Sequence, residues 1–188
     1  MLKVDIISAS IRTNRKSHRV ALFLKNYIEE NQLAIANILD LKEYQFPVFE
    51  ERLSYQKDPD KKILEFAERI KASDGLIIVT PEYNGSFPAS LKNITDLLYD
   101  EWKRKPIAIS TVSNGPFGGS QALISLQFTL WKMKAWTVPA LFPVPNVDTT
   151  FDENGKPIEA DKINIRTKAF IDELLWCIQA IQIMNSNN

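Results

Sequence analysis

The chain has 188 residues, of which 45% are hydrophobic and 24% are charged, and this is typical of one globular domain spanning residues 1–188. Its 23 lysines and arginines balance 23 acidic residues, so a large basic face for nucleic acid is not expected. No apolar run approaches the roughly 18–20 residues of a membrane span. The first residues are typical of a strand rather than of a signal peptide. From the balanced charge and the absence of a long apolar run, we expect neither a nucleic-acid nor a membrane partner.

The chain has one cysteine and one histidine. Cys177 cannot form an intramolecular disulfide or a zinc site alone, and it falls inside an amphipathic helical pattern, so we interpret it as structural. These features indicate a reducing cytoplasm, and we expect no metal site. His18 has around it no arrangement of serine and aspartate, or of cysteine, that suggests nucleophilic catalysis, which argues against a hydrolase triad.

The first predicted strand, residues 3–8, leads into a loop rich in hydroxyl groups and cations. A helix is predicted to begin near Ser17, because apolar residues follow at spacings of three and four. Unpaired N–H groups and the dipole at a helix start favour an anion, and arginine grips phosphate in bidentate fashion. The candidate ligands are Ser10, Arg12, Arg15, Lys16 and Ser17. The loop is neither a Walker A motif nor a dinucleotide fingerprint, and a capped helix with a solvated basic start is the alternative.

A second strand is predicted over residues 33–41 and a helix over residues 60–70. Residues 75–79 then form a continuous apolar run that suits a strand buried on both faces of a parallel sheet. It stops at Pro81, and the polar residues 82–86 follow where ligands bind in open α/β sheets. Pro88 fits the first turn of the next helix, with Ser86 or Phe87 at its cap. An ordinary polar turn is the alternative interpretation of residues 81–86.

The fourth strand is predicted over residues 106–112, and residues 113–120 after it hold three of the six glycines. Glycine lets a backbone pass close to a flat ligand. Trp102, just before this strand, is interpreted as either a core residue or a subunit contact. A helix over residues 121–134, a fifth strand over residues 135–141, a long excursion over residues 142–157 and a final apolar helical stripe complete the chain. Alternating strands and helices predict an α/β fold with a parallel five-stranded sheet.

The stretch P-E-Y-N-G-S-x-P-x-x-L-K-N-x-x-D, which starts at Pro81 and ends at Asp96, resembles the flavin-contacting motif of the NADPH-dependent FMN reductase family. That family includes bacterial quinone and chromate reductases and related azoreductases. Residues 10–17 are similar to its S-x-R-x-x-R-x-S phosphate loop, and residues 113–119 are similar to its S-x-G-x-x-G-G loop.

The resemblance implies a flavodoxin-like three-layer sandwich with strand order 2-1-3-4-5 and helices on both faces. It implies an FMN-containing oxidoreductase that takes hydride from NADPH or NADH and passes electrons to a quinone, flavin, azo compound or metal oxyanion. No side chain is expected to act as the catalyst, and a homodimer or homotetramer is expected. Besides the five phosphate-loop candidates, the implied cofactor-binding residues are Pro81, Glu82, Tyr83, Asn84, Gly85, Ser86, Ser113, Gly115, Gly118 and Gly119.

One departure from the family pattern concerns Ala9, which stands where the family usually has glycine. Alanine would strain the loop if this position required a positive φ. This residue motivates one alternative, a binding module that has kept the fold and lost the flavin. A second alternative is a non-catalytic flavin protein, an electron carrier or redox sensor, that uses the same loops.

Overall fold

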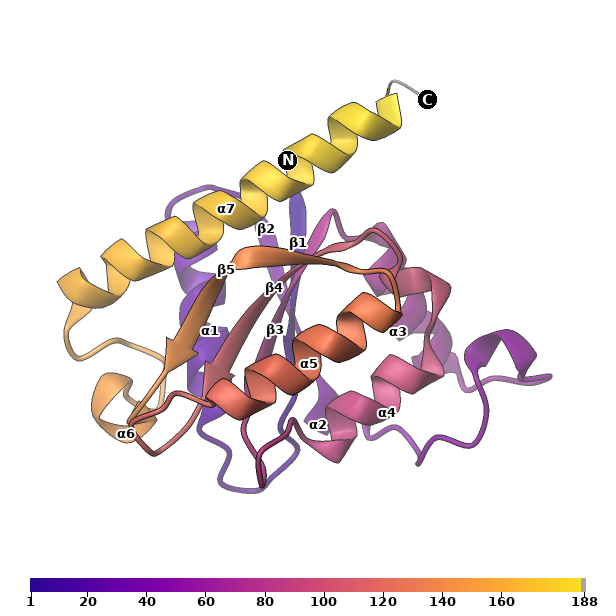
Figure 1. Cartoon of the computed structure of the whole chain (residues 1–188), viewed down its shortest axis with the longest axis horizontal. Coiled ribbons are helices and arrows are strands. Elements are labelled where there is room, and N and C mark those ends of the chain that lie inside the picture. The colour runs from indigo at the N-terminus through magenta and orange to yellow at the C-terminus, as the bar shows by residue number, and fades with distance from the viewer. Residues whose placement is uncertain (187–188) are drawn as a thin grey trace.

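The computed structural model describes residues 1–186. Its centre is a five-stranded parallel sheet in the order β2-β1-β3-β4-β5, which confirms the predicted flavodoxin-like order (Figure 1). The strands are β1 (Lys3–Ser8), β2 (Ile35–Asp40), β3 (Gly75–Pro81), β4 (Pro106–Val112) and β5 (Trp136–Val144).

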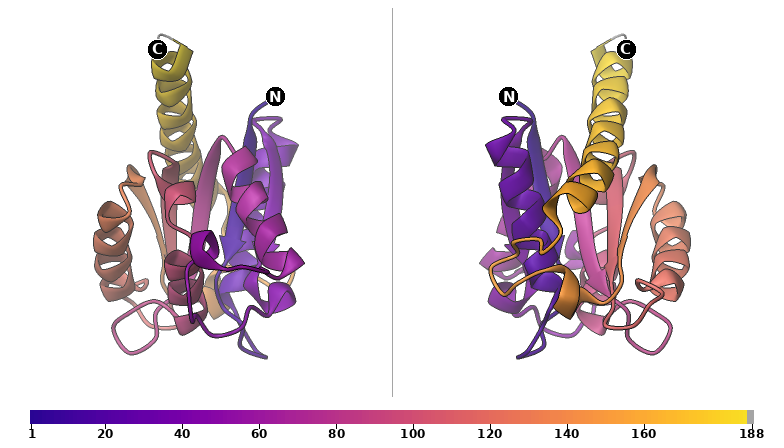
Figure 2. Two further views of the ribbon diagram at one scale, coloured as in Figure 1. Left: turned by 90° about the vertical axis from the view of Figure 1, so that its right-hand side faces the viewer. Right: turned by 90° about the vertical axis from the view of Figure 1, so that its left-hand side faces the viewer.

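Helices cover both faces of the sheet, as the three views together show (Figure 2). One layer consists of α1 (Ser17–Glu30) and α7 (Ala160–Ser186), and the C-terminal end of α7 extends past the sheet. The other layer consists of α3 (Lys61–Ala72), α4 (Ala89–Leu97) and α5 (Ser120–Lys132). The short elements are α2 (Leu41–Tyr44), α6 (Val147–Thr150) and the 3₁₀ turns η1 (Leu53–Tyr55) and η2 (Asp100–Trp102).

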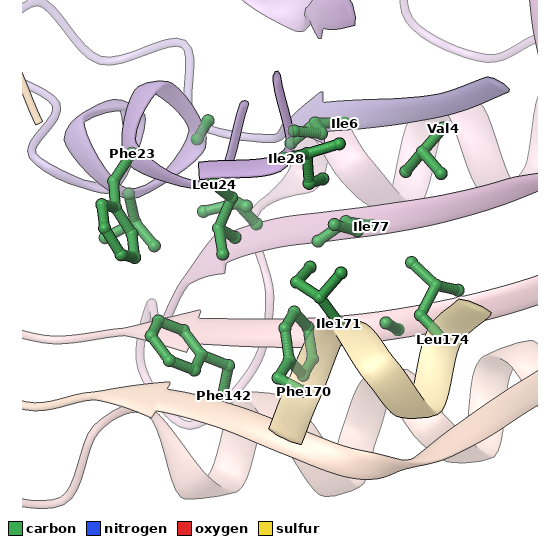
Figure 3. Close-up of a cluster of buried hydrophobic side chains, with 14 of the residues drawn as sticks. Val4, Ile6, Phe23, Leu24, Ile28, Ile77, Phe142, Phe170, Ile171 and Leu174 are labelled. Carbon is green, nitrogen blue, oxygen red and sulfur yellow. The ribbon is translucent and has the colours of Figure 1, made fainter. Parts of the chain in front are cut away.

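The two layers follow from the alternation of side chains along each strand. Ile77 of β3 points into the core beneath α1 and α7, whereas its neighbour Ile78 points into the core beneath α3, α4 and α5. The first of these cores is shown in Figure 3, where Leu24 of α1 lies near Ile77 of β3 and Phe170 of α7 lies beside Phe142 of β5. Because both faces of β3 are covered, its sequence is a continuous apolar run rather than an alternating one.

The end of β5 differs from the sequence prediction. The strand continues to Val144, so the long excursion predicted from residue 142 is shorter and contains α6. Phe142 and Val144 are buried and pair with Ser110 and Val112 of β4. Proline is tolerated at Pro143 because β5 lies at the sheet edge, where a missing N–H breaks no central ladder.

Two local predictions near α4 are also settled. Pro88 occupies the N-cap position rather than the first turn, and neither Ser86 nor Phe87 caps the helix. Trp102 is fully buried, and its Nε1 donates to the Leu98 carbonyl oxygen at 3.2 Å, so this residue belongs to the core.

Cys177 is fully buried on α7, as expected of a structural residue, and burial raises the pKa of its thiol. Within residues 1–186, none of the helices combines the length and the apolar character needed to span a membrane.

Candidate functional site

Three loops meet at the carboxyl edge of the sheet, toward which all five strands point (Figure 1). They follow β1, β3 and β4 and comprise residues 9–16, 82–88 and 113–119. We call them the phosphate loop, the hairpin loop and the glycine loop. The strand order reverses between β1 and β3, and such a switch point is where open α/β sheets bind ligands.

The phosphate loop begins at Ala9, whose φ is not among the positive values of the chain, so alanine causes no left-handed strain there. Its N–H donates to the Val79 carbonyl oxygen at 3.0 Å, and its carbonyl oxygen accepts from the Ser90 hydroxyl at 2.6 Å. The departure from the family's glycine therefore leaves the loop anchored on both sides.

Ser17 opens α1 at the far end of this loop. Its side chain is buried, and its Oγ has no hydrogen-bond partner within the described residues. Buried hydroxyl groups are nearly always paired, because leaving one unpaired costs about 1–3 kcal/mol. An unpaired Oγ beside the free N–H groups of a helix start is a feature that a bound anion would satisfy.

Arg15 has a partner already. Its guanidinium forms a bidentate ion pair with Asp40 at the end of β2 and also donates to the Ser10 carbonyl oxygen at 3.0 Å. Burial alone would raise the pKa of the Asp40 carboxyl. Hydrogen bonds from Arg15 and from the Lys42 backbone N–H outweigh it and hold that pKa below its usual value. Arg15 thus connects the phosphate loop, through the Ser10 carbonyl oxygen, to the end of β2.

The other cations of the loop lie nearer the surface. Lys16 and Arg19 both contact the Asp148 carboxylate, which fixes α6 beside the start of α1. Arg12 is exposed and stands over the Tyr83 ring, with 5.6 Å between its Cζ and the ring centroid. Lys16 thus contacts α6, whereas Arg12 contacts the hairpin loop.

The hairpin loop is a tight turn. Tyr83 and Ser86 exchange backbone hydrogen bonds of 2.7 and 3.1 Å, and the two residues between them, Asn84 and Gly85, have φ of +50° and +79°. Positive φ at both central positions is why Asn-Gly suits this turn. The Tyr83 hydroxyl also lies 2.7 Å from the Ser10 hydroxyl, which joins the hairpin loop to the phosphate loop.

Of the three glycines in the glycine loop, two occupy positions whose backbone conformation requires glycine. Gly118 and Gly119 have φ of +62° and +80° and are buried, whereas Gly115 is exposed and has open space where a Cβ would stand. Ser113 is held from within, because its hydroxyl donates to the Gly115 carbonyl oxygen at 2.9 Å. The loop thus packs its two left-handed glycines against β4 and the end of β5 and leaves Gly115 exposed.

Sequence reasoning missed a cluster around His18. Its Nδ1 lies 3.0 Å from the Ser8 hydroxyl and 3.8 Å from the Asp40 carboxylate, although these residues are far apart in the chain. Ser8 is fully buried, and both neighbours approach the same ring nitrogen, so the cluster lacks the serine–histidine–aspartate relay of a hydrolase. Burial, followed by the charge of Arg15, lowers the pKa of His18.

These loops define a class of protein before any comparison. A helix start with a buried, unpaired hydroxyl lies beside two turns at the switch point of a flavodoxin-like sheet, and this combination suits a flavin mononucleotide. The unpaired Ser17 hydroxyl fits a phosphate, and the positive-φ turns of the hairpin and glycine loops suit a backbone that approaches a flat ring closely. The described residues therefore fit FMN.

Comparison with known proteins agrees with this class. Residues 2–149 match the family described as NADPH-dependent FMN reductase, so the chain belongs to that family. The NAD(P)H-dependent FMN reductase LOT6 of Saccharomyces cerevisiae is 33% identical over 71% of this chain and 75% of its own length. A quinone reductase of Pseudomonas putida is 30% identical over 90% of this chain and 91% of its own.

A solved structure supports the fold. The flavoenzyme NAD(P)H:(acceptor) oxidoreductase FerB of Paracoccus denitrificans superimposes with a TM-score of 0.78, at 21% identity, over 96% of this chain and 98% of its own. Family membership confirms the predicted activity in its general form: the protein is an oxidoreductase that uses FMN and NAD(P)H.

Proposed function

We propose that the FMN phosphate binds at the start of α1, in contact with Ser10, Arg12, Lys16 and Ser17, while Arg15 holds the loop through Asp40. The observation that carries this proposal is the buried, unpaired Ser17 hydroxyl. It faces the same helix start as the free backbone N–H groups, and a phosphate oxygen would complete its hydrogen bonding.

The flavin ring then extends along the hairpin loop and the glycine loop. Backbone groups of Pro81, Glu82, Asn84 and Gly85 would hydrogen-bond its polar edge, with Tyr83 and Ser86 setting the shape of the turn. Backbone N–H groups of Gly115, Gly118 and Gly119 in the glycine loop would stabilise negative charge on the ring, while Ser113, whose N–H donates to the Val144 carbonyl oxygen at 3.0 Å, would hold the start of the loop.

When held by these residues, FMN would supply the redox chemistry between NADPH or NADH as donor and the electron acceptor. The protein's residues hold the phosphate, orient the ring and leave one face open to the donor and then to the acceptor. No general base is required of a side chain. We assign the acceptor to small oxidants that fit an open crevice, such as quinones, flavins, azo compounds or metal oxyanions.

We further propose a homodimer or a homotetramer in a reducing cytoplasm. Ile124, Phe128 and Trp131 are exposed at spacings of four and three along α5, and this apolar stripe suits a subunit contact. The free, buried Cys177 suits a reducing compartment.

A visible spectrum tests the proposal directly. The purified chain is titrated with FMN and then mixed with NADPH or NADH without oxygen. Flavin absorbance that bleaches within seconds supports a reductase, and a screen of acceptors then identifies the oxidant class. Bound flavin that stays oxidised would indicate an electron carrier or redox sensor. Failure to bind FMN at micromolar concentration would contradict the assignment of the FMN site.

A further inference from the structure

The Glu82 side chain has partners that its place in the hairpin loop does not predict. Its carboxylate accepts hydrogen bonds from the backbone N–H groups of Gln121 at 3.0 Å and of Ala122 at 3.2 Å. These residues are the second and third of α5, and their N–H groups are two that a helix start leaves unpaired.

The start of α5 has no cap of its own. Gly119 stands at the N-cap position with φ of +80° and carries no side chain, so it cannot supply the oxygen that serine or aspartate would. Glu82, which lies 39 positions before Gln121 in the chain, performs that role instead. Because Glu82 of the hairpin loop supplies the cap, the N-cap position itself can be occupied by glycine.

Further contacts join the same two elements. The Ser86 hydroxyl lies 2.9 Å from the Ser125 hydroxyl of α5, and the backbone N–H of Glu82 donates to the Val112 carbonyl oxygen at 3.3 Å. A Cβ on Gly85 would come within 2.6 Å of the Gln121 side-chain oxygen, so this turn packs directly on α5. The hairpin and glycine loops are therefore held as one unit.

The cap also places the negative charge of the Glu82 carboxylate at the N-terminus of α5, next to the glycine loop. A helix N-terminus carries about half a positive charge, and α5 starts directly after the loop assigned to the flavin ring. The Glu82 carboxylate offsets that charge. Charge near the ring tunes the electronics of a bound flavin, and reduced FMN is more negative than oxidised FMN.

From these contacts, and on the basis of the proposed FMN site, we infer that Glu82 is a positioning residue with two effects. It fixes the hairpin loop to the start of α5, and it keeps the reduction potential of bound FMN low by cancelling the positive end of that helix. A low potential suits transfer of electrons onward to a weak oxidant.

The variant Glu82→Gln separates charge from shape, because its amide oxygen still reaches the two N–H groups. The matched control is Glu30→Gln, an identical change at the exposed last residue of α1, the opposite end of that helix from the phosphate loop. In the Glu82→Gln protein loaded with FMN, the potential is expected to rise by the equivalent of about a tenfold shift toward reduced flavin, about 30 mV for two electrons. Glu30→Gln is expected to leave it unchanged.

A second measurement needs no flavin. In the FMN-free chain, Glu82→Ala removes the capping oxygen, so amide hydrogen exchange at Gln121 and Ala122 should accelerate severalfold, whereas Glu30→Gln should keep the wild-type rate. Equal exchange rates in the two variants would overturn the cap. An unchanged or lowered potential in Glu82→Gln would overturn the electrostatic role, and a merely structural role would not move the potential.

The two proposals fail in distinguishable ways. A wild-type chain that takes up no FMN would overturn the proposed function and, with it, the electrostatic role of Glu82. The exchange measurement would still decide whether Glu82 caps α5. Uptake and reduction of FMN with no change of potential in Glu82→Gln would overturn this inference alone.

Discussion

The hydroxyl groups of Ser10 and Tyr83 lie 2.7 Å apart, although 73 residues separate them in the chain. Ser10 belongs to the phosphate loop after β1, and Tyr83 opens the hairpin loop after β3. Their contact closes the switch point between the two strands and sets the spacing of the two loops. Arg12, above the Tyr83 ring, adds a second contact across the same gap.

Removing this contact should affect cofactor binding more than folding. Tyr83→Phe keeps the ring and loses only the hydroxyl, which contributes about 1 kcal/mol as a typical hydrogen bond. FMN affinity is therefore expected to fall about fivefold, as measured by quenching of flavin fluorescence. Tyr55→Phe, at an exposed tyrosine of η1, is the control and should bind like the wild type. Equal affinity in both variants would contradict a role for this pair in spacing the loops.

Ser17→Ala should separate stability from affinity. The Ser17 hydroxyl is buried without a partner, so its removal should raise the free energy of unfolding of the FMN-free chain by about 1 kcal/mol. The same change removes a hydrogen bond to a charged phosphate, worth about 1.5–3 kcal/mol, so FMN binding should weaken at least about tenfold. Urea unfolding and FMN titration check the two effects. Ser54→Ala, at an exposed serine, should change neither, and unaltered FMN binding in Ser17→Ala would remove Ser17 from the phosphate site.

The sequence predicted the sheet because β3 and β4 are buried apolar runs that need no partner to be identified. It could not predict contacts between distant residues. Arg15 is as good a phosphate ligand as any in sequence, and only the fold brings Asp40 beside it. Likewise, nothing near Glu82 in the chain indicates that its carboxylate caps a helix. The last residues of β5 were missed because prolines masked a strand that lies at a sheet edge.

The two kinds of glycine in the glycine loop should behave differently on substitution. Gly119→Ala forces alanine to φ of +80° and places a Cβ 3.0 Å from the Thr111 Cβ, so the free energy of unfolding should fall by at least about 1–2 kcal/mol. Gly115→Ala is the matched control, since its Cβ would meet nothing within 4 Å and its φ is not positive. Urea unfolding compares the two. Equal losses would mean that the loop adopts another backbone in solution.

The last prediction concerns pH and His18, the single histidine of the chain. Burial and the charge of Arg15 lower its pKa in the folded state below the ordinary value of 6.5. Between the folded pKa and 6.5, the unfolded chain binds more protons than the folded one, so the free energy of unfolding rises with pH in that window. The contribution of His18 is complete above about pH 6.5 and is lost as the pH falls below it.

Stability should therefore decrease as the pH is lowered from 7.5 to 5.5, with a slope of at most about 1.4 kcal/mol per pH unit from this one proton. Carboxyl groups titrate mainly at lower pH, so His18 dominates the change in this window. His18→Gln removes the titrating ring and keeps a group that can hydrogen-bond to the Ser8 hydroxyl, so its unfolding free energy should be nearly flat over the same range. Urea unfolding at several pH values checks both proteins. A variant with the wild-type slope, or a wild type that gains stability on acidification, would contradict a half-buried His18 with a lowered pKa that lies beside the Ser8 hydroxyl.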